Sequence, residues 1–108
     1  MSVVDTGRSF ELEEEGLTAY ATYRRAGDTL TIPHVEAPMA LRGKGTAGRL
    51  MEAIAAHARM QGLKIVPTCP YAIAWFRRHP EERARCLAPD QALALGAAAK
   101  RRLREPPT

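Results

Sequence analysis

Three glycines, Gly43, Gly45 and Gly48, stand among basic residues in segment 40–50 of the chain. The residues before the segment alternate like a strand and those after it follow a helical period, so a strand is expected to turn into a helix here. Glycine adopts positive φ and lets backbone N–H groups approach a ligand, and a helix N-terminus adds partial positive charge. The segment therefore predicts a cradle for a phosphate-bearing ligand, with a plain strand-to-helix turn as the other interpretation.

A cysteine lies at a second junction between a strand and a helix. Cys69 follows the expected strand 63–67 and precedes a helix that Pro70 is suited to begin. A helix N-terminus favours the thiolate and makes a cysteine nucleophilic at neutral pH, so Cys69 is a candidate to accept an acyl group. Cysteine is also a common small buried residue, and that interpretation stays open beside the first.

A histidine and a glutamate share one face of the expected strand 29–36. The period of two places His34 and Glu36 on the face that also carries Leu30 and Ile32, which is the inner face. An imidazole beside a carboxylate could relay a proton during catalysis. A hydrogen-bonded histidine with a structural carboxylate is the alternative interpretation.

The elements that position these residues follow from hydrophobic periodicity and from turn residues. Strands are expected over 9–13, 17–24, 29–36 and 63–67, and helices over 46–61, 70–78 and 90–104. Gly62 is expected to end the first helix and Pro80 the second. Pro33 cannot donate a ladder hydrogen bond, so its strand is expected to be bulged or at an edge there and to splay from its neighbour.

The order of these elements predicts an α+β fold. An antiparallel meander comes first, and a strand, a crossover helix and a second, parallel strand follow it as a βαβ unit. The glycine segment then lies at the carboxyl end of the first parallel strand. Trp75 and Phe76 on the second helix are expected in the core.

Length and composition limit the class of protein. The chain has 108 residues, so a single domain over 1–108 is expected, with a core over about 9–81 and a helical extension over 82–108. Neither a membrane span nor a signal peptide is apparent, which indicates a soluble, cytoplasmic protein. Cys69 and Cys86 show no metal-ligand spacing, so neither a metal site nor a disulfide is expected.

The formal net charge is +4, with an isoelectric point near 9.5. This excess fits an anionic small ligand as well as a nucleic acid. The densest basic cluster is 100–104, at the end of an expected helix, where cations complement the helix dipole in any case. Nucleic acid is therefore not the expected partner, although an accessory protein that uses this helix is a weaker hypothesis.

The glycines fit the sequence motifs for two common phosphate ligands, dinucleotides and nucleoside triphosphates, poorly. Gly43, Gly45 and Gly48 match the spacing of the dinucleotide fingerprint, but no Asp or Glu ends the strand 63–67, where a ribose would need it. A Walker sequence is absent, because no Gly-x-x-x-x-Gly-Lys is followed by Ser or Thr.

The same residues, read as Arg42-x-x-Gly45-x-Ala47, resemble the loop of the GNAT superfamily of acetyl-CoA-dependent N-acetyltransferases. That superfamily also has an antiparallel meander, a splayed strand, the loop with its helix, and a diverging parallel strand. The chain looks closest to a minimal single-domain subfamily with a Pro-x-Cys-Pro turn after the parallel strand. The segments that carry this resemblance are 34–38, 41–47, 64–71 and 76–80.

The resemblance implies a set of coenzyme A contacts. The backbone of Met39, Ala40 and Leu41 is expected to pair with the pantetheine amides. The pyrophosphate is expected on the loop and the first turn of the helix, at Gly43, Lys44, Gly45, Thr46, Ala47 and Gly48. Lys44 and Arg49 could add positive charge, Arg42 could brace the loop, and Arg77 could reach the nucleotide end or simply face solvent.

The resemblance also implies catalytic candidates. Cys69 would be the nucleophile of an acetyl-enzyme, although direct transfer is usual in the superfamily. Tyr71 could protonate the departing thiolate, or its ring could simply pack. His34 and Glu36, singled out above by their shared strand face, could relay the proton from the amine in such a reaction, directly or through water.

The function expected from the sequence is acetyl-CoA-dependent transfer of an acetyl group to a primary amine, on a small molecule or a protein tail, without a metal. The alternative is a module of the same fold that binds coenzyme A or a partner without turnover.

Overall fold

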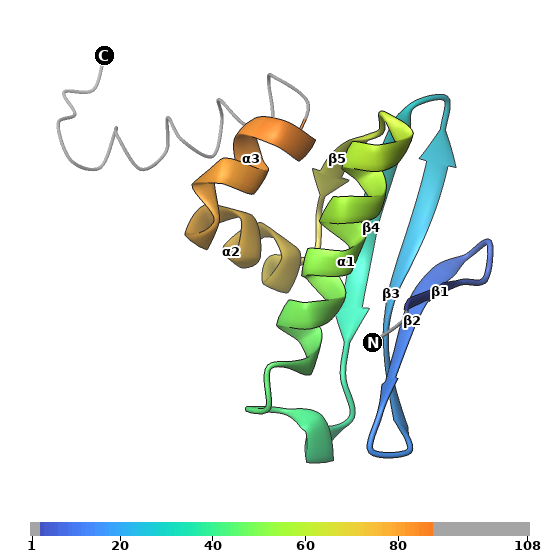
Figure 1. Cartoon of the computed structure of the whole chain (residues 1–108), viewed down its shortest axis with the longest axis vertical. Helices are drawn as coiled ribbons and strands as arrows, with labels where there is room; N and C mark the ends of the chain where they lie inside the picture. Colours follow the sequence, from blue (N-terminus) through green and yellow to red (C-terminus); the bar gives the residue numbers. More distant parts are fainter. Residues whose placement is uncertain (1–2, 88–108) are drawn as a thin grey trace, which may run out of the picture.

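The structure is a computed structural model that describes residues 3–87 of the chain. Figure 1 shows a sheet and helices packed against it. The elements, in chain order, are β1 (Val3–Asp5), β2 (Ser9–Glu14), β3 (Leu17–Ala26), β4 (Thr29–Glu36), the 3-10 turn η1 (Met39–Leu41), α1 (Thr46–Gln61), β5 (Lys64–Pro67), α2 (Pro70–Arg78) and α3 (Pro80–Cys86).

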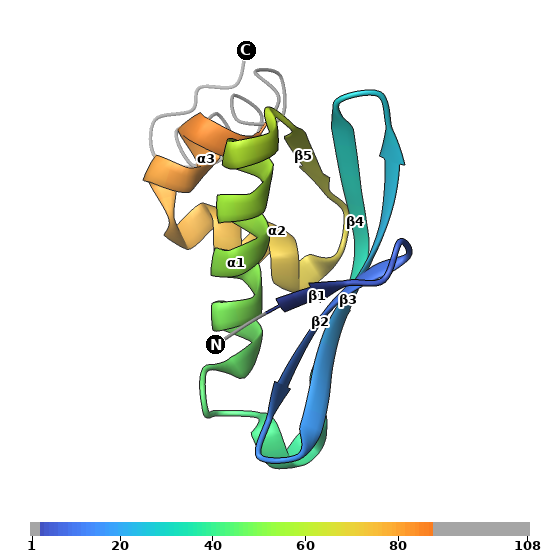
Figure 2. The same cartoon turned by 45° about the vertical axis from the view of Figure 1, so that its right-hand side comes forward.

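The five strands lie in the sheet in the same order as in the chain. Strands β1 to β4 pair antiparallel, and β5 pairs parallel with β4. Helix α1 provides the crossover between the two parallel strands. In Figures 1 and 2 all three helices lie on the same side of the sheet. This arrangement confirms the predicted α+β fold with a meander followed by a βαβ unit.

Helix α1 covers the sheet through one apolar stripe. Its buried members repeat with helical spacing, as the sequence predicts: Leu50, Met51, Ile54, Ala55 and Ala58. Gly62 ends the helix with a left-handed φ of 70°, and its N–H bonds to the carbonyls of Ala58 and Arg59. Trp75 and Phe76 are buried residues of α2, which confirms their predicted place in the core.

A β-bulge in β4 corrects the expected facing of His34 and Glu36. Thr22 of β3 pairs with His34, whereas Arg24 pairs with Thr31, so Ile32 and Pro33 together oppose one residue of β3. Every later side chain of β4 therefore moves to the other face of the sheet. The prediction that His34 and Glu36 share a face with Leu30 and Ile32 is wrong.

The register shows where these two side chains lie instead. Glu36 lies opposite Tyr20, and Val35 lies opposite the buried Ala21. Because paired residues share a face, Val35 points to the helices, while His34 and Glu36 lie on the polar face that no helix of the described region covers.

The parallel strands separate at Pro33, as its lack of an N–H group predicts. Pairing between β4 and β5 ends at Ile32 and Pro67. The Ile32 carbonyl then accepts hydrogen bonds from the N–H groups of Thr68 (3.1 Å) and Cys69 (3.2 Å). The second half of β4 therefore has β3 on one side and an open edge on the other.

Strand β1 and turn η1 were not predicted, and helix α3 was predicted only as part of the helical extension over 82–108. Pro80 ends α2, as expected, but it is also the first residue of α3, followed by Glu81 and Glu82 in the first turn. Proline and acidic residues are favoured at these positions, so the signal for α3 was present. The helix expected over 90–104 lies outside the described residues. None of the helices within 3–87 is both long and apolar enough to span a membrane.

Candidate active site

A cavity of about 620 Å³ lies at the carboxyl end of β4, where β5 has turned away. It is lined by His34, Val35, Glu36 and Ala37 at the end of β4, by Leu41, Arg42, Gly43, Gly45, Thr46, Ala47 and Gly48 from η1 to the first turn of α1, and by Tyr71 of α2. The cavity thus brings together three separate parts of the chain that the sequence singled out.

The rim formed by the loop and α1 presents unpaired backbone donors. Within residues 3–87, no acceptor is found for the N–H groups of Gly43, Gly45, Thr46, Ala47 and Gly48. The first α1 hydrogen bond is donated by the Arg49 N–H to the Gly45 carbonyl (3.0 Å), and no side chain caps the helix. Free N–H groups at a helix N-terminus bind anions well, so this rim can hold a phosphate group.

Two of the loop glycines need their left-handed backbone. Gly43 and Gly45 have φ of 82° and 81°. A Cβ at Gly43 would project into open space. A Cβ at Gly45 would come within 3.0 Å of Nη1 of Arg49, so that guanidinium packs closely against the loop.

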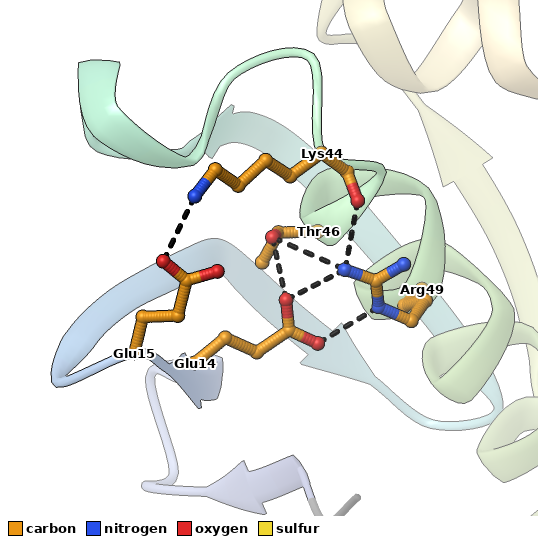
Figure 3. Close-up of polar contacts among 5 residues, drawn as sticks. All are labelled: Glu14, Glu15, Lys44, Thr46 and Arg49. Carbon is orange, nitrogen blue, oxygen red and sulfur yellow. Dashed lines mark hydrogen bonds and ion pairs between the residues drawn. The ribbon is translucent and has the colours of Figure 1, made fainter.

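A carboxylate from the β2–β3 hairpin holds the start of α1 (Figure 3). Glu14 accepts hydrogen bonds from Oγ1 of Thr46 (2.6 Å) and from Nε (2.8 Å) and Nη2 (2.7 Å) of Arg49. The Arg49 guanidinium and then the Thr46 hydroxyl lower the pKa of Glu14 to about 2. Sequence reasoning missed Glu14, because its partners lie more than thirty positions away in the chain.

The basic residues of the loop have different surroundings. Nη2 of Arg49 also donates to the Lys44 carbonyl (2.9 Å), and the Lys44 ammonium pairs with Glu15 (2.8 Å) at an exposed site. Neither Lys44 nor Arg49 lines the cavity, whereas Arg42 does. Arg42 also donates from Nε to the Ala37 carbonyl (3.3 Å).

His34 and Glu36 form a half-exposed pair at the cavity. Nε2 of His34 lies 2.8 Å from Oε1 of Glu36. A carboxylate can only accept, so Nε2 donates in this bond and Nδ1 remains available to accept a proton. The Tyr20 ring lies beside the imidazole, with 6.0 Å between ring centroids.

Tyr71 and Cys69 differ in their access to the cavity. Tyr71 lines it, and burial raises the pKa of this phenol, while Arg78 acts in the opposite direction. Cys69 is the N-terminal cap residue of α2, is 6% exposed and is not part of the lining.

Other predicted residues lie at the edges of the site or away from it. Met39 is 78% exposed, and Ala40 beside it is exposed too; neither lines the cavity. The Leu41 N–H bonds to the Pro38 carbonyl inside η1. Arg77 is exposed on α2 and outside the lining.

Cys86 is buried between α3 and α1, where Sγ lies 3.6 Å from the Ala55 carbonyl. The described region holds no group of three or more residues suited to bind a metal ion.

Comparison with known proteins agrees with this fold. A family model described as GCN5-related N-acetyl-transferase matches residues 9–85. The NMR solution structure of a GCN5-like protein from Staphylococcus aureus, described as a candidate N-acetyltransferase, has the same fold: the TM-score is 0.59 at 24% sequence identity, over 81% of this chain and 88% of that one. No protein in the curated set is a significant match.

The family match indicates an acyltransferase of the N-acetyl type. The chain belongs to the GCN5-related N-acetyltransferase family, because the family model spans most of its length. The narrower assignment to a subfamily with the turn 67–70 stays a prediction.

The charge on Glu14 should make the fold sensitive to acid. Its pKa is about 2 in the folded protein against an ordinary 4.5, so its contribution to stability is complete above pH 4.5 and is lost as the pH falls toward 2. We expect the Tm of the wild type to fall more steeply across this interval than that of Glu14→Gln. Thermal melts at several pH values measure this slope.

Glu15→Gln is the matched control, since Glu15 is the next residue of the same hairpin and, within residues 3–87, forms an ion pair only with the exposed Lys44. It should keep the acid slope of the wild type. If the Tm of Glu14→Gln fell as steeply with pH as that of the wild type, Glu14 would not be the source of the acid sensitivity.

Proposed function

We propose that the protein transfers an acetyl group from acetyl-CoA to a primary amine. The observation that carries this proposal is a set of five backbone N–H groups that have no acceptor among residues 3–87 and belong to residues lining the cavity at the N-terminus of α1. Within the family to which the chain belongs, a phosphate-bearing acyl donor is the natural ligand of such a set.

The loop suits a pyrophosphate better than a single carboxylate. Its donors extend from Gly43 to Gly48 and so can contact several phosphate oxygens at once. The open space at the Cα of Gly43 lets the ligand approach the backbone directly. Arg42 is the basic side chain of the cavity lining and adds positive charge there.

The open edge of β4 provides a place for the pantetheine arm. Beyond Ile32 this edge has lost its partner β5, yet Val35 and Ala37 still line the cavity. Amide groups of an extended ligand can pair with such an edge in the way that a further strand would. In this arrangement Met39 and Ala40 lie at the rim.

Two sets of side chains are placed to move protons. Acetyl transfer forms a bond from the amine nitrogen to the acyl carbon and breaks the bond from that carbon to sulfur. Tyr71 gives its proton to the leaving thiolate: the phenol is protonated at neutral pH, and burial raises its pKa further. His34, oriented by Glu36, accepts the proton that the amine loses, directly or through a water molecule.

The acceptor amine reaches the site from the uncovered polar face of the sheet. His34 and Glu36 belong both to this face and to the cavity lining. A small amine or the side chain of a protein tail can enter from this direction. This reaction needs no acyl-enzyme intermediate. Cys69 is buried and outside the cavity lining, and this position favours direct transfer.

Isothermal titration with coenzyme A and acetyl-CoA tests the proposal. The wild type should bind both, and Gly43→Ala should bind at least about tenfold more weakly, because the added methyl group fills the cradle; this ratio corresponds to about 1.4 kcal/mol. The absence of binding by the wild type at millimolar ligand would end the proposal.

Gly27→Ala is the control for backbone strain. Gly27 has a φ of 62° and, like Gly43, no atom near an added Cβ, but it lies in the turn between β3 and β4. It should lose stability to a similar extent and keep the affinity of the wild type. Equal affinities of Gly43→Ala and Gly27→Ala for coenzyme A would rule out this loop as the phosphate-binding site.

Tyr71→Phe should lower kcat about 100-fold, with a smaller change in KM, because general acid catalysis commonly contributes that much. Steady-state acetylation of a panel of amines measures both constants. Cys69→Ala should remain active, and intact-mass spectra of the wild type with acetyl-CoA should show no added acetyl group.

An acetyl adduct that disappears in Cys69→Ala but persists in Cys86→Ala would replace direct transfer by a covalent route. Binding of acetyl-CoA without acetylation of any amine would instead support a module without turnover.

A further inference from the structure

The pairing of Glu14 with Arg49 is unexpected beside an anion site. Arg49 lies in the first turn of α1, where a free guanidinium would attract a phosphate. Glu14 takes up both Nε and Nη2 of this guanidinium, from a hairpin on the other side of the loop (Figure 3). A cation that could bind the ligand is instead fixed within the protein.

The same carboxylate reaches the loop at three points. It accepts a hydrogen bond from the fully buried Thr46, the first residue of α1. Through Arg49 it supports the Lys44 carbonyl, to which Nη2 donates at 2.9 Å. Glu14 also holds the Arg49 guanidinium close to Gly45, where an added Cβ would lie 3.0 Å from Nη1.

These contacts fix the start of α1 as a helix cap would, but they leave the backbone N–H groups of the first turn unused. A side chain that caps a helix usually accepts from the second or third N–H of the first turn. Glu14 holds the first turn through the Thr46 hydroxyl and Arg49 instead, so the N–H groups of Ala47 and Gly48 have no acceptor within the described part of the chain.

We propose that Glu14 is a positioning residue that shapes the anion-binding loop in advance of the ligand. It keeps Arg49 as an internal brace, and the ligand is bound by backbone N–H groups. This inference rests on the proposed binding of coenzyme A and goes beyond it, since Glu14 is not among the residues that line the cavity.

The opposite role makes an opposite prediction. If Glu14 only withheld Arg49 from the phosphates, its neutralisation would release the guanidinium and tighten binding. If Glu14 braces the loop, its neutralisation disorders the loop and weakens binding. The direction of the change in affinity therefore decides between the two roles.

The experiment compares the wild type, Glu14→Gln and Glu15→Gln by titration with coenzyme A. We expect the Kd to rise about tenfold in Glu14→Gln, which corresponds to about 1.4 kcal/mol. Glu15→Gln, which breaks only the exposed pair with Lys44, should stay within about twofold of the wild type. In turnover, Glu14→Gln should raise the KM for acetyl-CoA and leave kcat at saturation unchanged.

A second measurement uses the free protein. 15N relaxation of the Gly43 and Gly45 amides should show lower order parameters in Glu14→Gln than in the wild type. Should Glu14→Gln not fold, Glu14→Asp keeps the charge but shortens the side chain, and it should weaken binding in the same direction.

Unchanged or tighter binding of coenzyme A by a folded Glu14 variant overturns the bracing role while leaving the proposed function in place. Failure of the wild type itself to bind overturns the proposed function and this inference with it.

Discussion

The separation of β4 from β5 is the constraint on which the site depends. Both strands carry a proline at this point, and the last pair of the parallel ladder joins Ile32 to Pro67. The bulge at Ile32 and Pro33 then turns the rest of β4, so that Val35 faces the helices and His34 faces the uncovered side. A regular strand would have closed the cavity and pointed the imidazole into the core.

The site combines backbone N–H groups, which can bind an anion, with the Arg49 guanidinium, which Glu14 holds away from the ligand. Backbone N–H groups at the start of α1, which find no acceptor in residues 3–87, belong to the cavity lining, while the Arg49 guanidinium beside them is neutralised by Glu14. Fixed backbone dipoles need no rearrangement when an anion arrives, whereas a long basic side chain must be ordered. The hairpin between β2 and β3 thereby takes part in the site although it does not line it.

Local patterns in the sequence were sufficient for most elements. The bounds of α1, the turn at Gly62 and the order of the strands from β2 to β5 follow from periodicity and from glycine, and the structure confirms them. The face of His34 could not be predicted, since the period of two fails after a bulge whose position depends on pairing with β3. Glu14 was missed for a related reason: its contacts with Thr46 and Arg49 join distant parts of the chain.

The central claim is that coenzyme A binds to the backbone of the loop before α1. Amide chemical shifts recorded by 15N–1H NMR during a titration with coenzyme A test it most directly. The account predicts the largest shifts at the N–H groups of Gly43, Gly45 and Gly48, with smaller ones at Val35 and Tyr71. Saturable shifts confined to another surface, or no shifts at millimolar ligand, would contradict it.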